Sequence, residues 1–351
     1  MLSYRKLAMR VLGRPLYTGG GNDSPRPASQ RAAAFILTAA MLTTLTAPAF
    51  AKTWDIANGD ITVKAGEAEG PNNVKQGDND FVKDEGETVI TGKSDKNTVT
   101  IEAENENDKV EVTFENVNID ASSGNKAAVS VTGKGDTNIE LNGDNELKSG
   151  PNRAGLEHNK TDTSGKLTIQ DKDNNGSLDA TGGRGGAGIG SASGQDGQVT
   201  ITGGTITATA GSSSGRFIYG GGSGIGGGDG GAGDGGNGDV EITGGTITAT
   251  GFYGAGIGGG RSADGDVTIS GGTIKKATSV FPDNDKASQP GGAGIGGGYA
   301  GNGNIIIKDD AVIEEVQGGE GSAGIGSGCY GATSEIEISG NAKIENVTCL
   351  L

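Results

Sequence analysis

Short apolar pulses separated by Gly and Thr dominate the chain, and the stretch Gly238 to Gly260 shows this pattern most regularly. In its sequence, GDVEITGGTITATGFYGAGIGGG, the apolar pulses fall at Val240 with Ile242, at Ile247 and at Ile257. Alternation of Ile or Val with Thr and Glu predicts very short β-strands that bury one face. The glycines between the pulses then predict turns rather than disorder.

The same three pulses recur along the rest of the chain. The first pulse recurs as Val110/Val112, Ile139/Leu141, Leu167/Ile169, Val199/Ile201, Val240/Ile242, Val267/Ile269, Ile305/Ile307 and Ile336/Ile338. The second recurs as Ile119, Leu147, Leu178, Ile206, Ile247, Ile274, Ile313 and Ile344. The third recurs as Val129, Leu156, Ile189, Ile225, Ile257, Ile295 and Ile325, most of them inside an Ala-Gly-Ile segment. Length varies mainly between the second pulse and the third, so insertions are confined to one loop of a structural repeat.

Two geometries fit one repeat. Gly244-Gly245 can form a hairpin turn that brings Ile242 and Ile247 onto one face. The same glycines can instead form a corner of a solenoid, in which each pulse stacks on its equivalent in the next coil at about 4.8 Å per rung. The hairpin offers no place to bury the Ala-Gly-Ile segment. The pattern therefore favours an all-β fold, a three-sided parallel β-helix (β-solenoid) of about seven to nine coils.

The chain divides into three segments by composition. Residues 1–51 combine basic residues with an apolar run and end in Ala49-Phe50-Ala51, which predicts a signal peptide cleaved after Ala51. Residues 52–97 are less regular, and we expect their short strands to cap the first coil of the repeat. Residues 98–351 form the expected β-helix domain. A secreted or surface location follows from the leader, with no membrane insertion after its removal.

The charge of the chain argues against some classes of binding partner, and its two cysteines raise the question of a disulfide. The chain has a formal net charge of −16, and the leader carries six basic residues against one acidic residue, so its removal makes the protein more acidic. Such a surface repels nucleic acid and anionic lipid. The two cysteines, Cys329 and Cys349, lie near the C-terminus; export permits a disulfide there, but the spacing does not decide whether it forms.

The repeats carry a resemblance. ITGGTITATG followed by GAGIGGG, together with VEVTFENVNIDAS and LNGDNELKSG, is similar to a family of exported bacterial right-handed parallel β-helix proteins with Gly-rich repeats, some of which bind carbohydrate. The resemblance extends from about Ile56 to the end of the chain. It implies a secreted or surface binding protein without a recognised catalytic centre.

Arginines and aromatic residues gather beside the third pulse. Aromatic rings stack on sugars and Arg pairs with carboxylates, so a strip of both along the insertion-tolerant loop edge suits a polysaccharide, including an acidic one, or a cell-surface glycan. The alternative is that large side chains merely fit at these coil edges. The candidate ligand-binding residues are Arg153, Arg184, Arg216, Phe217, Tyr219, Phe252, Tyr253, Arg261, Tyr299 and Tyr330.

Other candidate sites are less specific. Asp171, Asp173, Asn175 and Asp179 resemble the start of a calcium loop, but position twelve is Gly182 rather than Glu, so a polar turn is the favoured interpretation. No cofactor is otherwise expected, and Ca²⁺ is the only ion that the pattern suggests. His158, the single histidine, lacks a catalytic partner in sequence and is predicted in an exposed turn.

Three hypotheses about function follow. The leading one is a non-enzymatic β-helix that binds carbohydrate along its loop edge by repeated weak contacts. The second is a polysaccharide lyase or hydrolase, for which the sequence marks out no pair of carboxylates. The third is a structural spacer or the passenger of a larger secreted system.

Overall fold

The computed structural model describes residues 52–67, 70–212, 220–230, 235–281 and 290–350. The predicted leader lies outside the described residues, which form one compact unit. The described residues form strands, turns and one short 3₁₀ helix (η1, Ile56–Asn58). Among them, no helix is long and apolar enough to cross a membrane.

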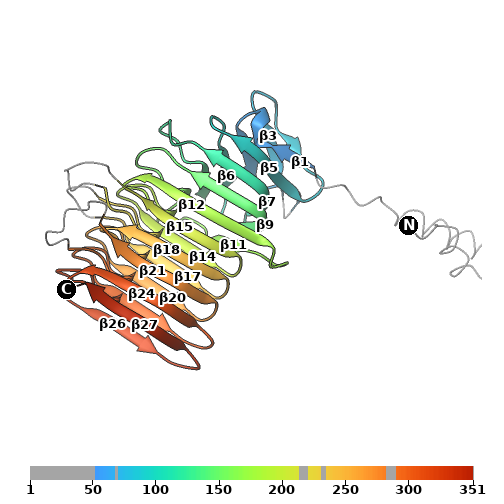
Figure 1. The fold of residues 1–351 in the computed structure, drawn as a ribbon. Helices are drawn as coiled ribbons and strands as arrows, with labels where there is room; N and C mark the ends of the chain where they lie inside the picture. Colours follow the sequence, from blue (N-terminus) through green and yellow to red (C-terminus); the bar gives the residue numbers. More distant parts are fainter. Residues whose placement is uncertain (1–51, 68–69, 213–219, 231–234, 282–289, 351) are drawn as a thin grey trace, which may run out of the picture. The chain divides into compact units, whose positions relative to one another are not determined.

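The strands form parallel ladders in which each coil stacks on the next, and Figure 1 shows this stacking from β1 to β27 in chain order. Parallel pairing between coils, rather than antiparallel pairing within a repeat, excludes the hairpin geometry and confirms the parallel β-helix. The first-pulse ladder comprises β11 (Leu167–Gln170), β14 (Asp196–Ile201), β17 (Gly238–Ile242), β20 (Gly265–Ile269), β23 (Gly303–Ile307) and β26 (Ser334–Ile338).

The second pulse forms its own ladder and the third pulse another. The second comprises β12 (Gly176–Arg184), β15 (Thr205–Gly211), β18 (Thr246–Phe252), β21 (Thr273–Val280), β24 (Val312–Glu320) and β27 (Lys343–Leu350). The third comprises β2 (Ile61–Lys64), β6 (Val99–Ala103), β8 (Val129–Gly133), β10 (Leu156–Lys160), β13 (Ile189–Gly190), β16 (Ile225–Gly226), β19 (Ile257–Gly258), β22 (Ile295–Gly296) and β25 (Ile325–Gly326).

The first coils join two of these ladders in longer strands. β1 (Thr53–Asp55), β5 (Thr88–Ser94), β7 (Lys109–Asp120) and β9 (Asp136–Lys148) pair in parallel, and β9 then pairs with both β11 and β12. The parallel ladders therefore extend into residues 52–97, the segment expected to cap them. Within that segment, β3 (Asn73–Gln76) pairs antiparallel with β2 and with β4 (Val82–Lys83).

The core consists of columns of equivalent apolar side chains. Ile201, Ile242, Ile269 and Ile307 stack in register and are fully buried. The third pulse stacks in the same way, from Ile189 through Ile225 and Ile257 to Ile295. In both of these columns the apolar side chains of neighbouring coils pack directly on one another.

The early coils depart from the predicted register. Ile139 stacks on Val112, and Leu141 stacks on Phe114, so the predicted equivalence of Ile139 with Val110 was wrong by one alternation step. Leu147 likewise stacks on Ala180 rather than on Leu178. Alternation alone does not reveal a two-residue shift, because such a shift keeps the same face inward.

A glycine with a positive φ marks the corner between the first and second pulses. In the coil of β17 and β18, Gly245 adopts a φ of 85°, which L side chains rarely adopt, and the chain turns between the two strands. In β9 the equivalent ladder position is Gly143, with a φ of 64°, although the strand there is continuous from Asp136 to Lys148. The Gly-Gly pairs are thus corners, as the solenoid geometry required.

The glycine of the Ile-Gly step in the third pulse has a separate role. Gly258 has a φ of 131°, and a Cβ atom there would lie 2.1 Å from the carbonyl oxygen of Gly296 on the next coil. Only glycine allows this approach of neighbouring backbones. Close rung packing thus accounts for part of the GAGIGGG motif.

Candidate functional site

The structure brings several of the predicted binding residues together on adjacent coils. Tyr253 follows β18 at the corner of its coil, and Arg261 and Tyr299 lie in the loops that follow β19 and β22. The backbone N–H of Tyr299 donates to the carbonyl oxygen of Tyr253 at 2.8 Å, and the Arg261 N–H donates to Gly221 at 3.0 Å. Backbone hydrogen bonds between coils therefore fix the relative positions of these side chains.

The side chains of this region pack ring against ring. The guanidinium carbon of Arg261 lies 6.0 Å from the ring centroid of Tyr253 and 5.7 Å from that of Tyr299. Tyr299 meets Tyr330 edge to face, with ring centroids 5.6 Å apart. Tyr253 meets Phe281 in the same manner at 4.8 Å. We call Tyr253, Arg261, Phe281, Tyr299 and Tyr330 the loop-edge cluster.

Exposure varies sharply within the loop-edge cluster. Tyr253 is 8 % exposed, Arg261 and Tyr299 are half-buried, and Tyr330 is 75 % exposed. Tyr330 also has a φ of 68°, in the left-handed region that a bulky side chain rarely occupies. Tyr299 packs against the ring of Tyr330, which is the most exposed member of the cluster.

Other predicted residues lie apart from the cluster. Phe252 is half-buried in the last position of β18, and Arg184 is exposed at the end of β12. Arg153 donates to Glu157 at 2.9 Å, so its guanidinium is engaged in an ion pair with a carboxylate that is 3 % exposed. The remaining three predicted residues, Arg216, Phe217 and Tyr219, lie outside the described residues.

Phe281 is a member of the cluster that sequence reasoning missed. Phe252 pairs with Val280 in the ladder, so Phe281 occupies the position after β21 that Tyr253 occupies after β18. An alignment of the two repeats on their second pulses, allowing for the bulge at Lys275, would have found it. The candidate residues were chosen for their closeness to an Ala-Gly-Ile segment, and Phe281 lies too far from the nearest such segment to be included.

The predicted calcium ligands are not gathered round one point. Asp171 accepts hydrogen bonds from the backbone N–H groups of Asn175 at 3.1 Å and Gly176 at 2.9 Å, so its carboxylate closes its own turn. Asp173 and Asn175 are exposed in that turn, whereas Asp179 lies in β12 beside Glu146 of β9. Burial and then Glu146 raise the pKa of Asp179. Across the described ranges, no group of three or more His, Cys, Asp or Glu residues is arranged to hold a metal ion.

The prediction for His158 was wrong. His158 lies in β10, is 2 % exposed, and its Nδ1 lies 2.9 Å from the carbonyl oxygen of Gln198. The start of β14 pairs antiparallel with the end of β10 and covers the face that was expected to meet solvent. Burial lowers the pKa of His158, so the ring is neutral near pH 7.

The two cysteines are both free in the structure. Cys329 is half-buried and Cys349 is exposed in β27. Burial, with a smaller contribution from Glu320, raises the pKa of the Cys329 thiol. The disulfide that the sequence left open is therefore not formed here.

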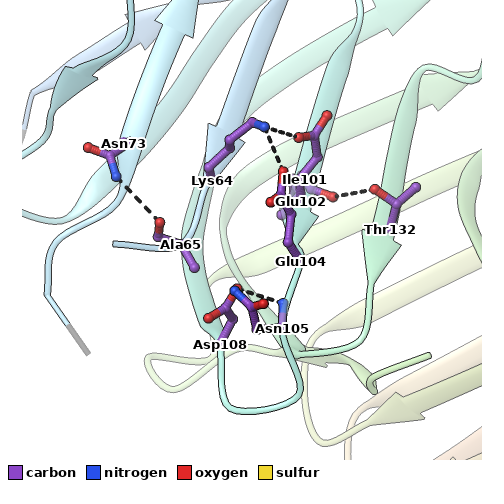
Figure 2. Close-up of polar contacts among 9 residues, drawn as sticks. All are labelled: Lys64, Ala65, Asn73, Ile101, Glu102, Glu104, Asn105, Asp108 and Thr132. Atoms are coloured by element: carbon purple, nitrogen blue, oxygen red, sulfur yellow. Dashed lines mark hydrogen bonds and ion pairs between the residues drawn. The ribbon is translucent and has the colours of Figure 1, made fainter. Parts of the chain in front are cut away.

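A polar cluster near the start of the solenoid was also missed. Lys64 of β2 lies between Glu102 of β6 and Glu104 beyond it, with Nζ to carboxylate distances of 2.8 Å in each case (Figure 2). Hydrogen bonding to Glu102, then to Glu104, raises the pKa of Lys64. Asp108 accepts from the backbone N–H of Asn105 at 2.8 Å in the adjoining turn. Lys64 supplies the positive charge among these acids, and the cluster ties the first two coils together.

Comparison with known proteins supports the architecture alone. A family model described as beta helix repeat matches residues 240–261 and 267–299. These ranges contain all of β18, β19, β21 and β22 and the last three residues of β17 and of β20. The chain contains beta helix repeats. No curated protein and no solved structure matches the chain. The repeat describes the scaffold and does not specify a ligand.

Proposed function

We propose that this β-helix repeat protein is exported and binds carbohydrate at its loop-edge cluster, without a catalytic role. The ligand class is a polysaccharide or cell-surface glycan. If Arg184 and Arg261 contact the ligand, an acidic polysaccharide is favoured, because arginine pairs with carboxylates. The proposal combines the resemblance of the repeats with the arrangement of aromatic residues at one edge.

The exposed ring of Tyr330 is the observation that carries this proposal. A tyrosine ring offers an apolar face to the C–H groups of a sugar and a hydroxyl to its polar rim. Tyr330 is 75 % exposed and is held edge to face against Tyr299, so its orientation is set before a ligand arrives. Ordering the ring in advance lowers the entropic cost of binding.

Repetition along the solenoid extends the contact from one ring to a polymer. Tyr299 and Arg261 lie on the coils that precede Tyr330, and equivalent positions on neighbouring coils are separated by about 4.8 Å. Arg184, exposed at the end of β12, adds a guanidinium further along. A glycan that follows these coils gains several weak contacts, each of modest strength.

Replacement of Tyr330 by glycine tests the site. Glycine removes the ring and relieves the left-handed φ of 68°, so the variant keeps its fold. We expect Tyr330→Gly to weaken retention on immobilised glycan by about tenfold, equivalent to about 1.4 kcal/mol. The measurement is affinity electrophoresis of the purified protein through gels that contain acidic or neutral polysaccharides.

Phe81→Ala is the matched control, because Phe81 is also an exposed aromatic residue (42 %) but lies between β3 and β4. It should leave retention unchanged. Equal retention of Tyr330→Gly, Phe81→Ala and the unmodified protein on every polymer would remove the basis for the site.

Export is tested separately. Expression of the full chain in a bacterium with an intact secretory system should yield a product whose mass corresponds to cleavage after Ala51. A cytoplasmic product that retains residues 1–51 would contradict export while leaving the binding test intact.

A further inference from the structure

A polar groove lies on the outer face of the first coils, far along the chain from the loop-edge cluster. Its floor is the outward face of β7, β9 and β11, and its wall comprises residues 70–72 and 86–88. The volume is about 610 Å³, within the range of small-molecule sites in proteins. The side chains that define its chemistry are Glu87, Lys109, Glu111, Asn138, Glu140 and Lys172.

Contacts along the floor fix the polar groups of the groove. Glu140 accepts from the backbone N–H of Lys172 at 2.7 Å, and the Lys172 ammonium lies 3.5 Å from its other oxygen. The hydroxyl of Thr113 donates to Glu87. In the wall, the amide of Asn72 donates to the hydroxyl of Thr88 at 3.0 Å and to the carbonyl oxygen of Glu111 at 2.8 Å. These bonds hold wall and floor together before any ligand is present.

The chemistry of the lining excludes several classes of ligand. No aromatic side chain lines the groove, and its two apolar members are Pro71 and the buried Val112, so nothing favours an apolar peptide side chain. Three carboxylates face two ammonium groups, and one of those, Lys172, is paired with Glu140. A polyanion such as polyuronate or nucleic acid would therefore meet net negative charge.

Alternating donors and acceptors fit a polyhydroxylated ligand. Each sugar hydroxyl both donates and accepts a hydrogen bond, and carboxylates, carboxamides and ammonium groups together satisfy both functions. Charged groups also form the stronger hydrogen bonds to such hydroxyls. Glu111 and Asn138 are neighbours in one row of the ladder, and Glu140 and Gln170 are neighbours in the next row. Polar groups therefore recur at about 4.8 Å along the floor, the scale of one sugar ring.

We infer that this groove binds a neutral oligosaccharide, through Glu111 and Asn138 on the floor and Glu87 at the wall. The inference rests on residues that the loop-edge proposal does not use. Either site can therefore fail without affecting the other.

A double variant in the floor tests the inference. In Glu111→Ala/Asn138→Ala, the two central hydrogen-bonding groups are lost from outward positions, which leaves the buried columns intact. Isothermal titration of the purified protein with neutral oligosaccharides of graded length (gluco-, manno-, xylo- and chito-oligosaccharides) should show saturable binding to at least one series. The double variant should weaken that binding at least tenfold.

Glu241→Ala is the matched control. Glu241 continues the outward column of Asn138, Thr168 and Thr200 on a later coil, outside the groove lining. It should bind like the unmodified protein. The double variant should cause the same loss in a Tyr330→Gly background, which separates this groove from the loop-edge cluster. Thermal unfolding of each variant confirms that the fold is retained.

Three outcomes would overturn the inference. The first is the absence of saturable binding to every neutral series. The second is binding that the double variant retains or that Glu241→Ala loses equally. The third is tighter binding of polygalacturonate or of a peptide than of any neutral oligosaccharide.

Discussion

At the scale of single residues, the solenoid tolerates polar groups in its core only where they find partners. Thr137 is an exception among the described residues, because its hydroxyl is fully buried and has no hydrogen-bond partner there. It lies in the column between Val110 and Leu167, where later coils place Ile or Val. A buried hydroxyl without a partner lowers the stability of a fold.

We therefore predict that Thr137→Val raises the free energy of unfolding by about 1 kcal/mol, since valine has the same shape and lacks the hydroxyl. Chemical denaturation with urea measures the change. Thr168→Val is the matched control, because Thr168 lies on the outward face of the next coil and its replacement should change stability by less than about 0.5 kcal/mol. Destabilisation by Thr137→Val would show that the hydroxyl is satisfied in solution.

His158 makes the stability depend on pH. Burial lowers its pKa below the ordinary value of 6.5, so the unfolded chain binds the proton more readily than the folded one. The stability that neutral His158 contributes to the fold is fully present above pH 6.5. It is lost as the pH falls from the pKa of His158 in the unfolded chain to its lower pKa in the folded protein. The loss cannot exceed about 1.4 kcal/mol per pH unit for one proton.

The pH prediction is tested by comparison of the protein with His158→Gln. Between pH 8 and about pH 5 the unmodified protein should lose more stability than the variant. The difference between the two curves of unfolding free energy against pH gives the effect of His158 alone. Burial raises the pKa of the neighbouring Glu157, so Glu157 stabilises the fold as the pH falls, which is the opposite sign. Parallel curves would show that His158 has the same pKa in both states.

At the scale of elements, the second-pulse column contains one polar member. Asn145 of β9 lies beneath Leu178 of β12 and is 2 % exposed. Its Oδ1 accepts from the backbone N–H of Val117 at 2.9 Å, and its Nδ2 donates to the carbonyl oxygen of Ser177 at 3.0 Å. Asn145 therefore satisfies backbone groups of both neighbouring coils where the irregular register of β7 leaves them unpaired.

Asn145→Ala should lower the free energy of unfolding by about 2 to 3 kcal/mol, because it leaves the Val117 N–H buried without an acceptor. Asn118→Ala is the control, since Asn118 bonds Glu146 on the half-buried outer face and should cost less than about 1 kcal/mol. Both changes are measured by urea denaturation. If the two variants lose the same free energy of unfolding, then water or a backbone shift replaces the hydrogen bond that Asn145 accepts from the Val117 N–H.

The sequence predicted the strand columns well and the coil edges poorly. Alternation identified the inward residues of β14, β17 and β20 because one face of each strand is buried in a regular repeat. It failed at Leu141 and Leu147, where a shift by two residues preserves the alternation, and at His158, where a second strand covers the outer face. The groove was invisible in sequence because its wall and floor come from segments distant along the chain.

The candidate cluster shows the same limit. Proximity to Ala-Gly-Ile segments placed Arg261, Tyr299 and Tyr330 together correctly, because the third-pulse ladder fixes the loops that follow it. The same criterion included Arg153, which the structure pairs with Glu157 instead. The distance along the sequence from a motif does not determine which residue a long side chain contacts in the fold.

At the scale of the whole solenoid, the first and last described coils are covered differently. At the first coil, Trp54 is 5 % exposed and its indole N–H donates to Asp84 at 2.7 Å, beside the antiparallel β3 and β4. At the last coil, Ile336 and Ile338 of β26 are 47 % and 55 % exposed, although the equivalent Ile305 and Ile307 of β23 are fully buried.

This difference predicts a gradient of protection along the solenoid. In a repeat protein each coil is stabilised by its neighbours, and a coil that has a neighbour on one side only opens more often. β26 and β27 pair with β23 and β24 respectively, and their outward edges have no partner strand in the described part of the chain. Amide hydrogen exchange should therefore be at least tenfold faster in residues 334–350 than in residues 303–320. Equal protection, measured by mass spectrometry at low protein concentration, would contradict the gradient and would show that the apolar face of the last coil is covered in solution.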